Sequence, residues 1–249
     1  MRAVMLAAGV GARLGAGEDA PPKVLLEFGG KSLLRRHLEI LRAVGVRELT
    51  LVLGYRADVI EREIADCGAR DFVRTTFNPD FRNGSIVSLW VVRDALRAGG
   101  DVLLMDGDVL YDPRILQRLM ATRHVNCFLM DRDFEPGDEP VKLCIRDGRI
   151  VDFEKRVEHA HDYAGESVGF FRFGEPVSRA LADAVESSVA AGRTADMYER
   201  AIREVLLAAP PDRFGFEDIT GLPWIEIDFP EDVERARREI LPRIEGAPT

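Results

Sequence analysis

Small residues and two separated cations mark the N-terminal segment as a candidate anion-binding loop. An apolar stretch from Arg2 to Ala8 runs into the sequence GVGARL at residues 9–14, and Lys23 follows Pro21-Pro22. Glycines allow backbone N–H groups to approach phosphate oxygens, and Arg13 and Lys23 supply positive charge that a loop alone lacks. An apolar strand that ends in such a loop is suited to binding a triphosphate.

Two aspartates that are far apart in the sequence could bind a divalent cation. Asp108 follows the apolar run 102–105, and Asp228 follows the run 224–227 and precedes an expected helix. Each aspartate alone also fits a turn or a helix N-terminus, where Asp is common. Asp106 lies on the same strand face as Asp108 and could support it. Because Mg²⁺ prefers carboxylate oxygens, the pair predicts a magnesium site built from two remote residues.

A polar segment lies between these two aspartates and the N-terminal loop. Residues 78–89 read NPDFRNGSIVSL, with Asn83, Gly84 and Ser85 at the expected start of a helix. Such a start can contact a nucleobase or an anion, or Asn83 and Ser85 can simply cap the helix. The residues alone fit both interpretations.

Alternating strands and helices in the first half would bring these candidates together. The expected strands are 2–8, 48–54, 72–77 and 101–105, and the expected helices are 32–44, 57–65 and 85–96. Apolar strands separated by amphipathic helices predict an α/β fold with a Rossmann-like, mainly parallel sheet flanked by helices. Ligands bind beyond the carboxyl ends of the strands in such sheets, which is where the glycine loop and Asp108 fall.

The second half has a different pattern. Strands are expected at 142–145, 148–154 and 167–173, with Asp147-Gly148 as a hairpin turn, so this region forms a smaller antiparallel lobe. Helices at 175–191 and 197–207, a strand at 224–228 and a closing helix from 231 follow. Without a repeat or a linker, we expect one domain over 1–249, in which residues 131–249 cover the substrate bound by residues 1–130.

Composition excludes several classes of protein. A net charge of −9 and a pI near 5.1 argue against a general nucleic-acid binder but allow a nucleotide held by local cations. Three widely spaced cysteines give neither a disulfide framework nor a metal knuckle. The apolar N-terminal run is too short for a signal peptide or a membrane span, so we expect a cytoplasmic protein without membrane contacts. His159 and His161 are interpreted as a solvated turn rather than a metal pair.

Three segments of the chain resemble the nucleotidyltransferase family. They are LAAGVGARL at 6–14 with Pro22-Lys23, LLMDGD at 103–108 and EIDFPEDV at 226–233. That family has a Rossmann-like GT-A fold and transfers a nucleoside monophosphate onto phosphorylated sugars or small alcohols. The helix start NGSIVSL and the hairpin over 141–155 are most similar to cytidylyltransferases, which act on phosphocholine, on 2-aminoethylphosphonate and related phosphonates, or on inositol 1-phosphate.

The resemblance implies a role for each matching position. It implies contacts with the nucleotide for Leu6, Ala7, Ala8, Gly9, Gly11, Asn83, Ser85 and Ser88. It implies catalytic roles for Arg13 and Lys23, which hold the triphosphate, and for Asp108 and Asp228, which bind Mg²⁺. It implies acceptor binding by Lys142 and Lys155, through a phosphate, and by Glu166, through a cationic or polar head group. Residues 15–20 depart from the family pattern because they carry two acids beside the phosphate site, and they could form a mobile lid.

The resemblance thus implies a Mg²⁺-dependent cytidylyltransferase. It would transfer CMP from CTP to phosphocholine, 2-aminoethylphosphonate or a similar acceptor and release pyrophosphate. The alternative is a sugar-1-phosphate or inositol-1-phosphate nucleotidyltransferase that uses CTP, UTP or another NTP. A nicotinamide-dependent oxidoreductase is disfavoured because Leu14 stands where a GxGxxG motif needs glycine, and a non-catalytic homologue is disfavoured because all four catalytic candidates are present. A homo-oligomer is compatible with the sequence.

Overall fold

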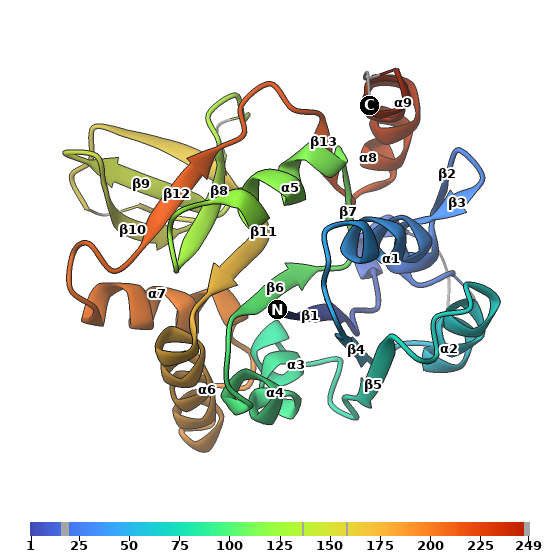
Figure 1. Ribbon diagram of the computed structural model, residues 1–249, viewed down its shortest axis with the longest axis horizontal. Coiled ribbons are helices and arrows are strands. Elements are labelled where there is room, and N and C mark those ends of the chain that lie inside the picture. The colour runs from blue at the N-terminus through green and yellow to red at the C-terminus, as the bar shows by residue number, and fades with distance from the viewer. Residues whose placement is uncertain (16–19, 136, 158, 247–249) are drawn as a thin grey trace.

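The computed structural model describes residues 1–15, 20–135, 137–157 and 159–246 of the chain (Figure 1). The expected acidic lid therefore lies largely outside the described residues, which include only its ends, Gly15 and Ala20. Within the described part of the chain, no helix combines the length and the apolar character needed to cross a membrane.

A mixed sheet forms the centre of the molecule and confirms the expected fold class. Its parallel part has the order β6-β1-β4-β5, made of β1 (Arg2–Ala7), β4 (Leu49–Leu53), β5 (Val73–Phe77) and β6 (Val102–Asp106). β1, β4 and β6 are largely buried because helices cover both faces of the sheet. Leu6 pairs with Asp106, so β1 and β6 end at the same edge.

One long strand, β11 (Tyr163–Phe173), joins this parallel part to an antiparallel region. It pairs with β9 (Lys142–Arg146) through its N-terminal end and with β6 through its C-terminal end, and β8 (Cys127–Asp131) pairs with it from Glu166 to Arg172. β10 (Arg149–Glu154) forms a hairpin with β9, and β12 (Gly215–Asp218) pairs in parallel with β8. Asp147 and Gly148 both have left-handed backbone angles, as the expected hairpin turn requires.

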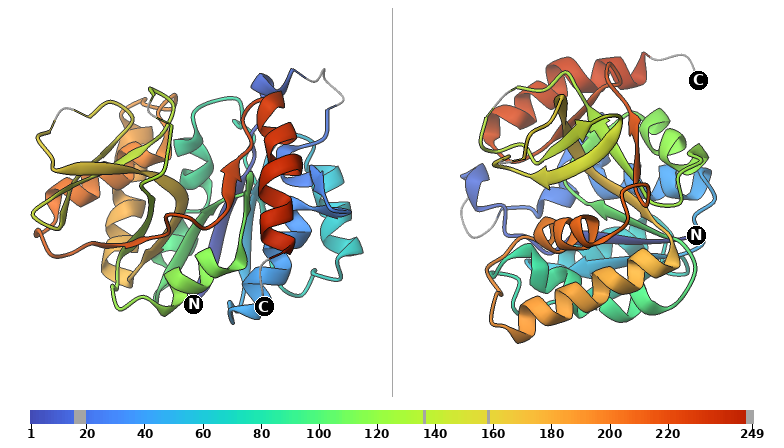
Figure 2. Two further views of the ribbon diagram at one scale, coloured as in Figure 1. Left: turned by 90° about the horizontal axis from the view of Figure 1, so that it is seen from above. Right: turned by 90° about the vertical axis from the view of Figure 1, so that its left-hand side faces the viewer.

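Helices cover the two faces of the sheet (Figures 1 and 2). One layer holds α1 (Leu33–Ala43), α2 (Ala57–Asp66) and α5 (Pro113–Ala121). The opposite layer holds α3 (Ser85–Val91), α4 (Arg93–Arg97), α6 (Glu175–Ala190) and α7 (Tyr198–Ala208). Successive strand residues serve opposite cores: Met5 and Leu103 pack with the first layer, and Val4 and Leu104 with the second.

A short ladder outside the main sheet has the largest consequence for the site. β7 (Val109–Tyr111) directly follows the end of β6 and pairs antiparallel with β13 (Trp224–Glu226). The C-terminal segment is thereby brought back to the carboxyl end of β6. It continues into α8 (Pro230–Arg235), a π-helical turn (Ala236–Ile240) and α9 (Leu241–Glu245), which lie beside the N-terminal part of the chain in Figure 2.

Small elements complete the described chain. They are β2 (Glu27–Phe28), β3 (Lys31–Ser32) and two 3₁₀ turns, Ala12–Leu14 and Lys23–Leu25.

The structure differs from the expected elements in three respects. The helix expected over 85–96 is divided into α3 and α4 because Val92 leaves the helical conformation, with φ −110° and ψ 14°. β11 begins at Tyr163 instead of at 167, and β8, β12 and α5 were not predicted.

Candidate active site

Two remote aspartates meet around one lysine at the carboxyl end of β6. The β7–β13 ladder continues through a hydrogen bond from the Ile227 N–H to the Asp108 carbonyl (3.0 Å), which places Asp228 beside Asp108. Lys23 Nζ lies 2.8 Å from Asp108 Oδ2 and 2.6 Å from Asp228 Oδ1. Burial disfavours the charge of this lysine, but the two carboxylates outweigh it and raise its pKa above the ordinary value. The predicted convergence of these three residues is present in the structure.

A third carboxylate, that of Glu226, belongs to the same cluster. The ligand oxygens of Asp108, Glu226 and Asp228 all lie within 4.8 Å of one another. The Glu226 side chain is exposed, and the surrounding protein atoms together with the charges of Asp108 and Asp228 raise its pKa above the ordinary value. Hard oxygen donors fit Mg²⁺, and the ammonium of Lys23 between two of them shows that the space accommodates a positive charge. Glu226 was missed from the sequence. Its position two residues before Asp228 would place both carboxylates on the same face of an extended chain, as it does Trp224, and this spacing was the available signal.

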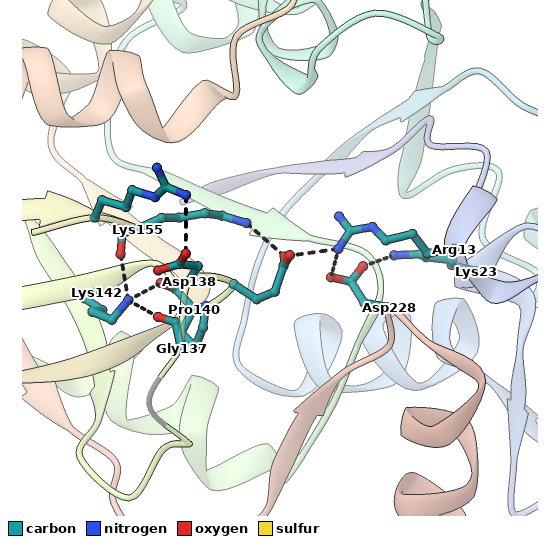
Figure 3. A network of polar contacts seen from close by, with 10 residues as sticks. Arg13, Lys23, Gly137, Asp138, Pro140, Lys142, Lys155 and Asp228 are labelled. Carbon is teal, nitrogen blue, oxygen red and sulfur yellow. Dashed lines mark hydrogen bonds and ion pairs between the residues drawn. The ribbon is translucent and has the colours of Figure 1, made fainter.

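Arg13 connects this cluster to the opposite wall of the site (Figure 3). Its Nη1 lies 3.4 Å from Asp228 Oδ2 and 3.2 Å from Glu139 Oε2, and its guanidinium packs over the ring of Phe229. Glu139 Oε2 also lies 3.5 Å from Lys155 Nζ. The Glu139 carboxylate therefore contacts both Arg13, which is predicted to bind the triphosphate, and Lys155, which is predicted to bind the acceptor.

A large cavity of about 900 Å³ extends from the glycine loop to the antiparallel region. Of the predicted nucleotide contacts, six line it: Leu6, Ala8, Gly9, Asn83, Ser85 and Ser88. Ala7 and Gly11 line a smaller adjoining pocket of about 210 Å³. Four residues line both cavities: Arg13, Lys23, Asp108 and Asp228. Gly11 has φ +65°, and a side chain there would crowd Lys23.

The start of α3 does not use its polar side chains as caps. The N-cap is Gly84, and no side chain caps this helix. The Ser85 hydroxyl accepts a hydrogen bond from the Tyr198 N–H (3.0 Å), and the Ser88 hydroxyl accepts one from Asn78 Nδ2 (3.0 Å). Ser85 thus ties α3 to α7 at the cavity wall, and the nucleotide contacts of Asn83, Ser85 and Ser88 stay predictions.

The predicted acceptor residues are placed differently from one another. Lys155 and Glu166 line the cavity, and burial beside Asp131 raises the pKa of Glu166 to about 7. Lys142 does not line it. Its ammonium donates to the carbonyl oxygens of Gly137 (2.6 Å), Pro140 (3.3 Å) and Lys155 (2.6 Å), which holds the connection between β8 and β9 against β10 (Figure 3).

Asp106 is turned away from the metal cluster toward α7. The Tyr198 hydroxyl donates to Asp106 Oδ2 (2.7 Å), and Gly169 of β11, with φ +76°, leaves room for this carboxyl group. Burial, together with the charges of Glu199 and Asp108, holds the pKa of Asp106 well above its usual range. Glu199, the next residue of α7, lines the same cavity and was missed from the sequence, because nothing local distinguishes it from an ordinary helix-start residue.

The histidines do not form a metal site among the described residues. His37 is buried on α1, and its Nε2–H donates to the carbonyl oxygen of Gly107 (3.2 Å), between Asp106 and Asp108. His159 Nδ1 lies 2.6 Å from the buried carboxylate of Asp152, and His161 is exposed. His37 therefore supports the turn that carries Asp108.

Comparisons with known sequences identify relatives along almost the whole chain. The chain is 29% identical over 242 residues to the CMP-5'-(3-aminopropyl)phosphonate synthase of Streptomyces rubellomurinus, covering 95% of the chain and 38% of that protein. It is 28% identical over 244 residues to a bifunctional IPC transferase and DIPP synthase of Rubrobacter xylanophilus, covering 96% and 52%. The chain thus spans about half or less of these relatives. The CTP:phosphoglutamine cytidylyltransferase of Campylobacter jejuni is 22% identical, with coverage of 94% and 98%.

Solved structures and a family model complete the comparison. The inositol-1-phosphate CTP transferase from T. maritima superposes with a TM-score of 0.75 at 21% identity, covering 100% of this chain and 97% of that one. The CTP:phosphocholine cytidylyltransferase from Streptococcus pneumoniae gives 0.73 at 18%, covering 94% and 96%. These likenesses support the fold. Residues 3–151, more than half of the chain, match the model of one family. The chain therefore belongs to the family of MobA-like NTP transferase domains.

Proposed function

We propose that this protein is a Mg²⁺-dependent cytidylyltransferase that transfers CMP from CTP to a small phosphate or phosphonate acceptor and releases pyrophosphate. The observation that carries this proposal is the convergence of Asp108, Asp228 and Lys23 at one end of a cavity that the glycine loop also lines. Mg²⁺ bound by Asp108 and Asp228, with Glu226 as a neighbouring donor, would neutralise phosphate charge during the reaction.

The chemistry needs positioning and charge neutralisation more than proton transfer. An ionised oxygen of the acceptor attacks the α-phosphorus of CTP, the bond from this phosphorus to the β-phosphate oxygen breaks, and pyrophosphate leaves. Because the attacking oxygen already carries negative charge, no general base is required. Arg13 and Lys23 exchange their carboxylate partners for phosphate oxygens and stabilise the leaving pyrophosphate, while Lys155 orients the acceptor from the other wall.

The choice of CTP rests on the relatives named above, several of which carry CTP or CMP in their names. An inositol-1-phosphate or sugar-1-phosphate nucleotidyltransferase is the second candidate. It is favoured by the superposition of the inositol-1-phosphate CTP transferase over the whole chain.

Pyrophosphate release tests the proposal. The protein is incubated with Mg²⁺ and one of CTP, UTP, GTP or ATP, together with phosphocholine, 2-aminoethylphosphonate, inositol 1-phosphate or a hexose 1-phosphate. We expect release with CTP and a phosphate or phosphonate acceptor, with the CMP adduct identified by mass spectrometry. Equal turnover of all nucleotides would contradict the cytidylyltransferase assignment, and no release with any pair would contradict a transferase acting on these acceptors.

A further inference from the structure

Lys142 and Lys155 lie at the same end of the β9–β10 hairpin but differ in their surroundings. Lys142 is the first residue of β9 and pairs with Glu154, the last residue of β10. Lys155 follows directly after this pair. Among the described residues, Lys155 lines the cavity and Lys142 does not. Lys155 is therefore placed to contact a substrate, whereas Lys142 is placed to act on the protein itself.

The ammonium group of Lys142 faces three backbone carbonyl oxygens. Its Nζ lies 2.6 Å from the carbonyl oxygen of Lys155, 2.6 Å from that of Gly137 and 3.3 Å from that of Pro140 (Figure 3). An ammonium group has three N–H donors, so these contacts use all of them. A phosphate can bind Lys142 only if the ammonium leaves at least one of these oxygens. The geometry therefore disfavours direct contact between Lys142 and an acceptor.

The same contacts fix the backbone from which the Lys155 side chain extends. The ladder between β9 and β10 ends at the pair of Lys142 and Glu154, so the bond to the Lys155 carbonyl continues the hairpin by one residue. The ammonium also holds residues 137–140, which include Glu139, and Glu139 Oε2 lies 3.5 Å from Lys155 Nζ. Lys142 thus restrains Lys155 twice, through its carbonyl group and through the segment that carries its counter-ion.

We propose that Lys142 is a positioning residue that acts on the acceptor through Lys155. This inference rests on the transferase function proposed above and on the role given there to Lys155. A lysine whose backbone is held samples fewer orientations, so its side chain loses less freedom when it binds a phosphate or phosphonate. Loss of Lys142 weakens acceptor binding although no contact with the acceptor is removed.

A double-mutant cycle tests this order of action. Steady-state rates are measured with CTP, Mg²⁺ and the acceptor that gives the most pyrophosphate release. We expect Lys142→Met to raise KM for the acceptor about ten-fold, with kcat and KM for CTP changed less than about three-fold. In a Lys155→Met background, the same substitution should change the acceptor KM less than about two-fold, because its target is absent. A further ten-fold increase in the double variant would overturn the proposal, since Lys142 would then act independently of Lys155.

Lys142→Arg separates positioning from charge. The charge of Lys142 also acts on Glu166, its cross-strand partner on β11, so Lys142→Met changes the electrostatics of the cavity as well. Arginine keeps the charge and binds phosphate well, but its planar guanidinium cannot direct its donors at three oxygens that surround one nitrogen. We expect Lys142→Arg to raise the acceptor KM as Lys142→Met does. A normal KM in Lys142→Arg would overturn the proposal, because charge or a phosphate contact would then suffice.

Arg156 provides a matched control next to Lys155. Its side chain contacts Asp138, and the two side chains are 81% and 76% exposed. Arg156→Met therefore removes a cation from the same stretch of chain without disturbing the three carbonyl contacts, and the acceptor KM should stay unchanged. If Arg156→Met raised this KM as much as Lys142→Met, loss of any nearby cation would explain the effect and the proposal would fail.

Hydrogen exchange separates failure of this role from failure of the proposed function. If no acceptor supports pyrophosphate release, the transferase assignment fails, but the backbone restraint can still be measured without substrates. Folded Lys142→Met should take up deuterium faster at residues 137–141 and 155–157 than the unmodified protein and Arg156→Met do. Unchanged uptake in these segments would overturn the positioning role even if the transferase activity were confirmed. Lys142→Gln replaces Lys142→Met in every assay if the latter does not fold.

Discussion

Lys23 is held between Asp108 and Asp228, where it balances two carboxylates. We expect Lys23→Ala and Asp108→Ala each to lower kcat/KM for CTP by about 10² to 10³, because each removes a group that stabilises the charge of the reacting phosphates. The fold should survive, since both side chains lie at the cavity and not in the core. Lys31→Ala removes an exposed lysine paired with Glu39 and serves as the control. Turnover near that of the unmodified protein in either variant would contradict the assigned roles.

His37 makes stability depend on pH. Burial lowers its pKa to about 4, below the ordinary value near 6.5, so the unfolded chain binds the proton more tightly. The associated stability is fully present above about pH 6.5 and is lost as the pH falls toward 4, by about 3 kcal/mol in total. We expect the difference in unfolding free energy between the unmodified protein and His37→Gln to shrink over this range in urea titrations. A difference that stays constant with pH would contradict this account, and exposed His161→Gln should show no such trend.

Local signals made the first set of site residues predictable. The glycine loop and the strand ends identified Arg13, Lys23, Asp108 and Asp228, which the structure brings together. Glu139 and Glu199 could not be found in this way, because each owes its position to elements that are remote in sequence. Lys142 matches the family pattern as well as Lys155 does, yet carbonyl groups take up its donors. Only the folded chain distinguishes the two lysines.

At the scale of elements, β11 bends past β6 through a glycine. Gly169 has φ +76°, and a Cβ atom there would collide with the Asp106 carboxyl group. We expect Gly169→Ala to cost about 1–3 kcal/mol more unfolding free energy than Gly148→Ala. Gly148 also has a positive φ, of +73°, but a Cβ atom there would meet nothing within 4 Å. Gly148→Ala therefore measures the cost of the backbone conformation alone, without a steric clash. Equal losses in chemical denaturation would show that Asp106 yields to the added methyl group.

Elements with a complete local pattern were predicted well, and those defined by tertiary pairing were not. α1 spans Leu33–Ala43 inside the expected 32–44, with Ser32 as its N-cap. β8 is only five residues long, and a short apolar run does not distinguish a strand from part of a helix. β12 is half-buried and follows a loop, so its own residues carry little strand pattern. Its extended conformation depends mainly on its pairing with β8. The break at Val92 leaves no signal of its own, because Val is tolerated in helices.

At the scale of the whole molecule, the site exists because the chain returns to its own beginning. Asp228 lies beside Asp108 through the β7–β13 ladder, and the helices that follow pack on Phe28 and Leu33 of the N-terminal part. The sequence predicted that strand ends would meet at one edge of a parallel sheet. It could not predict this ladder, since three-residue strands carry too little pattern for their partner to be inferred.

Glu139 links the two walls of the cavity before substrates arrive. It comes from the connection between β8 and β9 and contacts both Arg13 and Lys155, so it competes with phosphate groups for both cations. Because the Arg13 and Glu139 side chains are 49% and 65% exposed, their ion pair is weak, worth less than about 1 kcal/mol. We therefore expect Glu139→Gln to lower KM for CTP about two- to five-fold with kcat unchanged, in steady-state assays at low salt.

The neighbouring Asp138 provides a control for this competition. Asp138 pairs with exposed Arg156 and not with Arg13 or Lys155, so Asp138→Asn removes the same charge from the same connection without freeing either cation (Figure 3). If both variants lower KM equally, general electrostatics and not competition would explain the effect. Raising the ionic strength should narrow the difference between Glu139→Gln and the unmodified protein, because salt already screens an exposed pair. A higher KM in Glu139→Gln would instead show that the carboxylate helps to position Arg13, and the two walls would then cooperate in binding CTP.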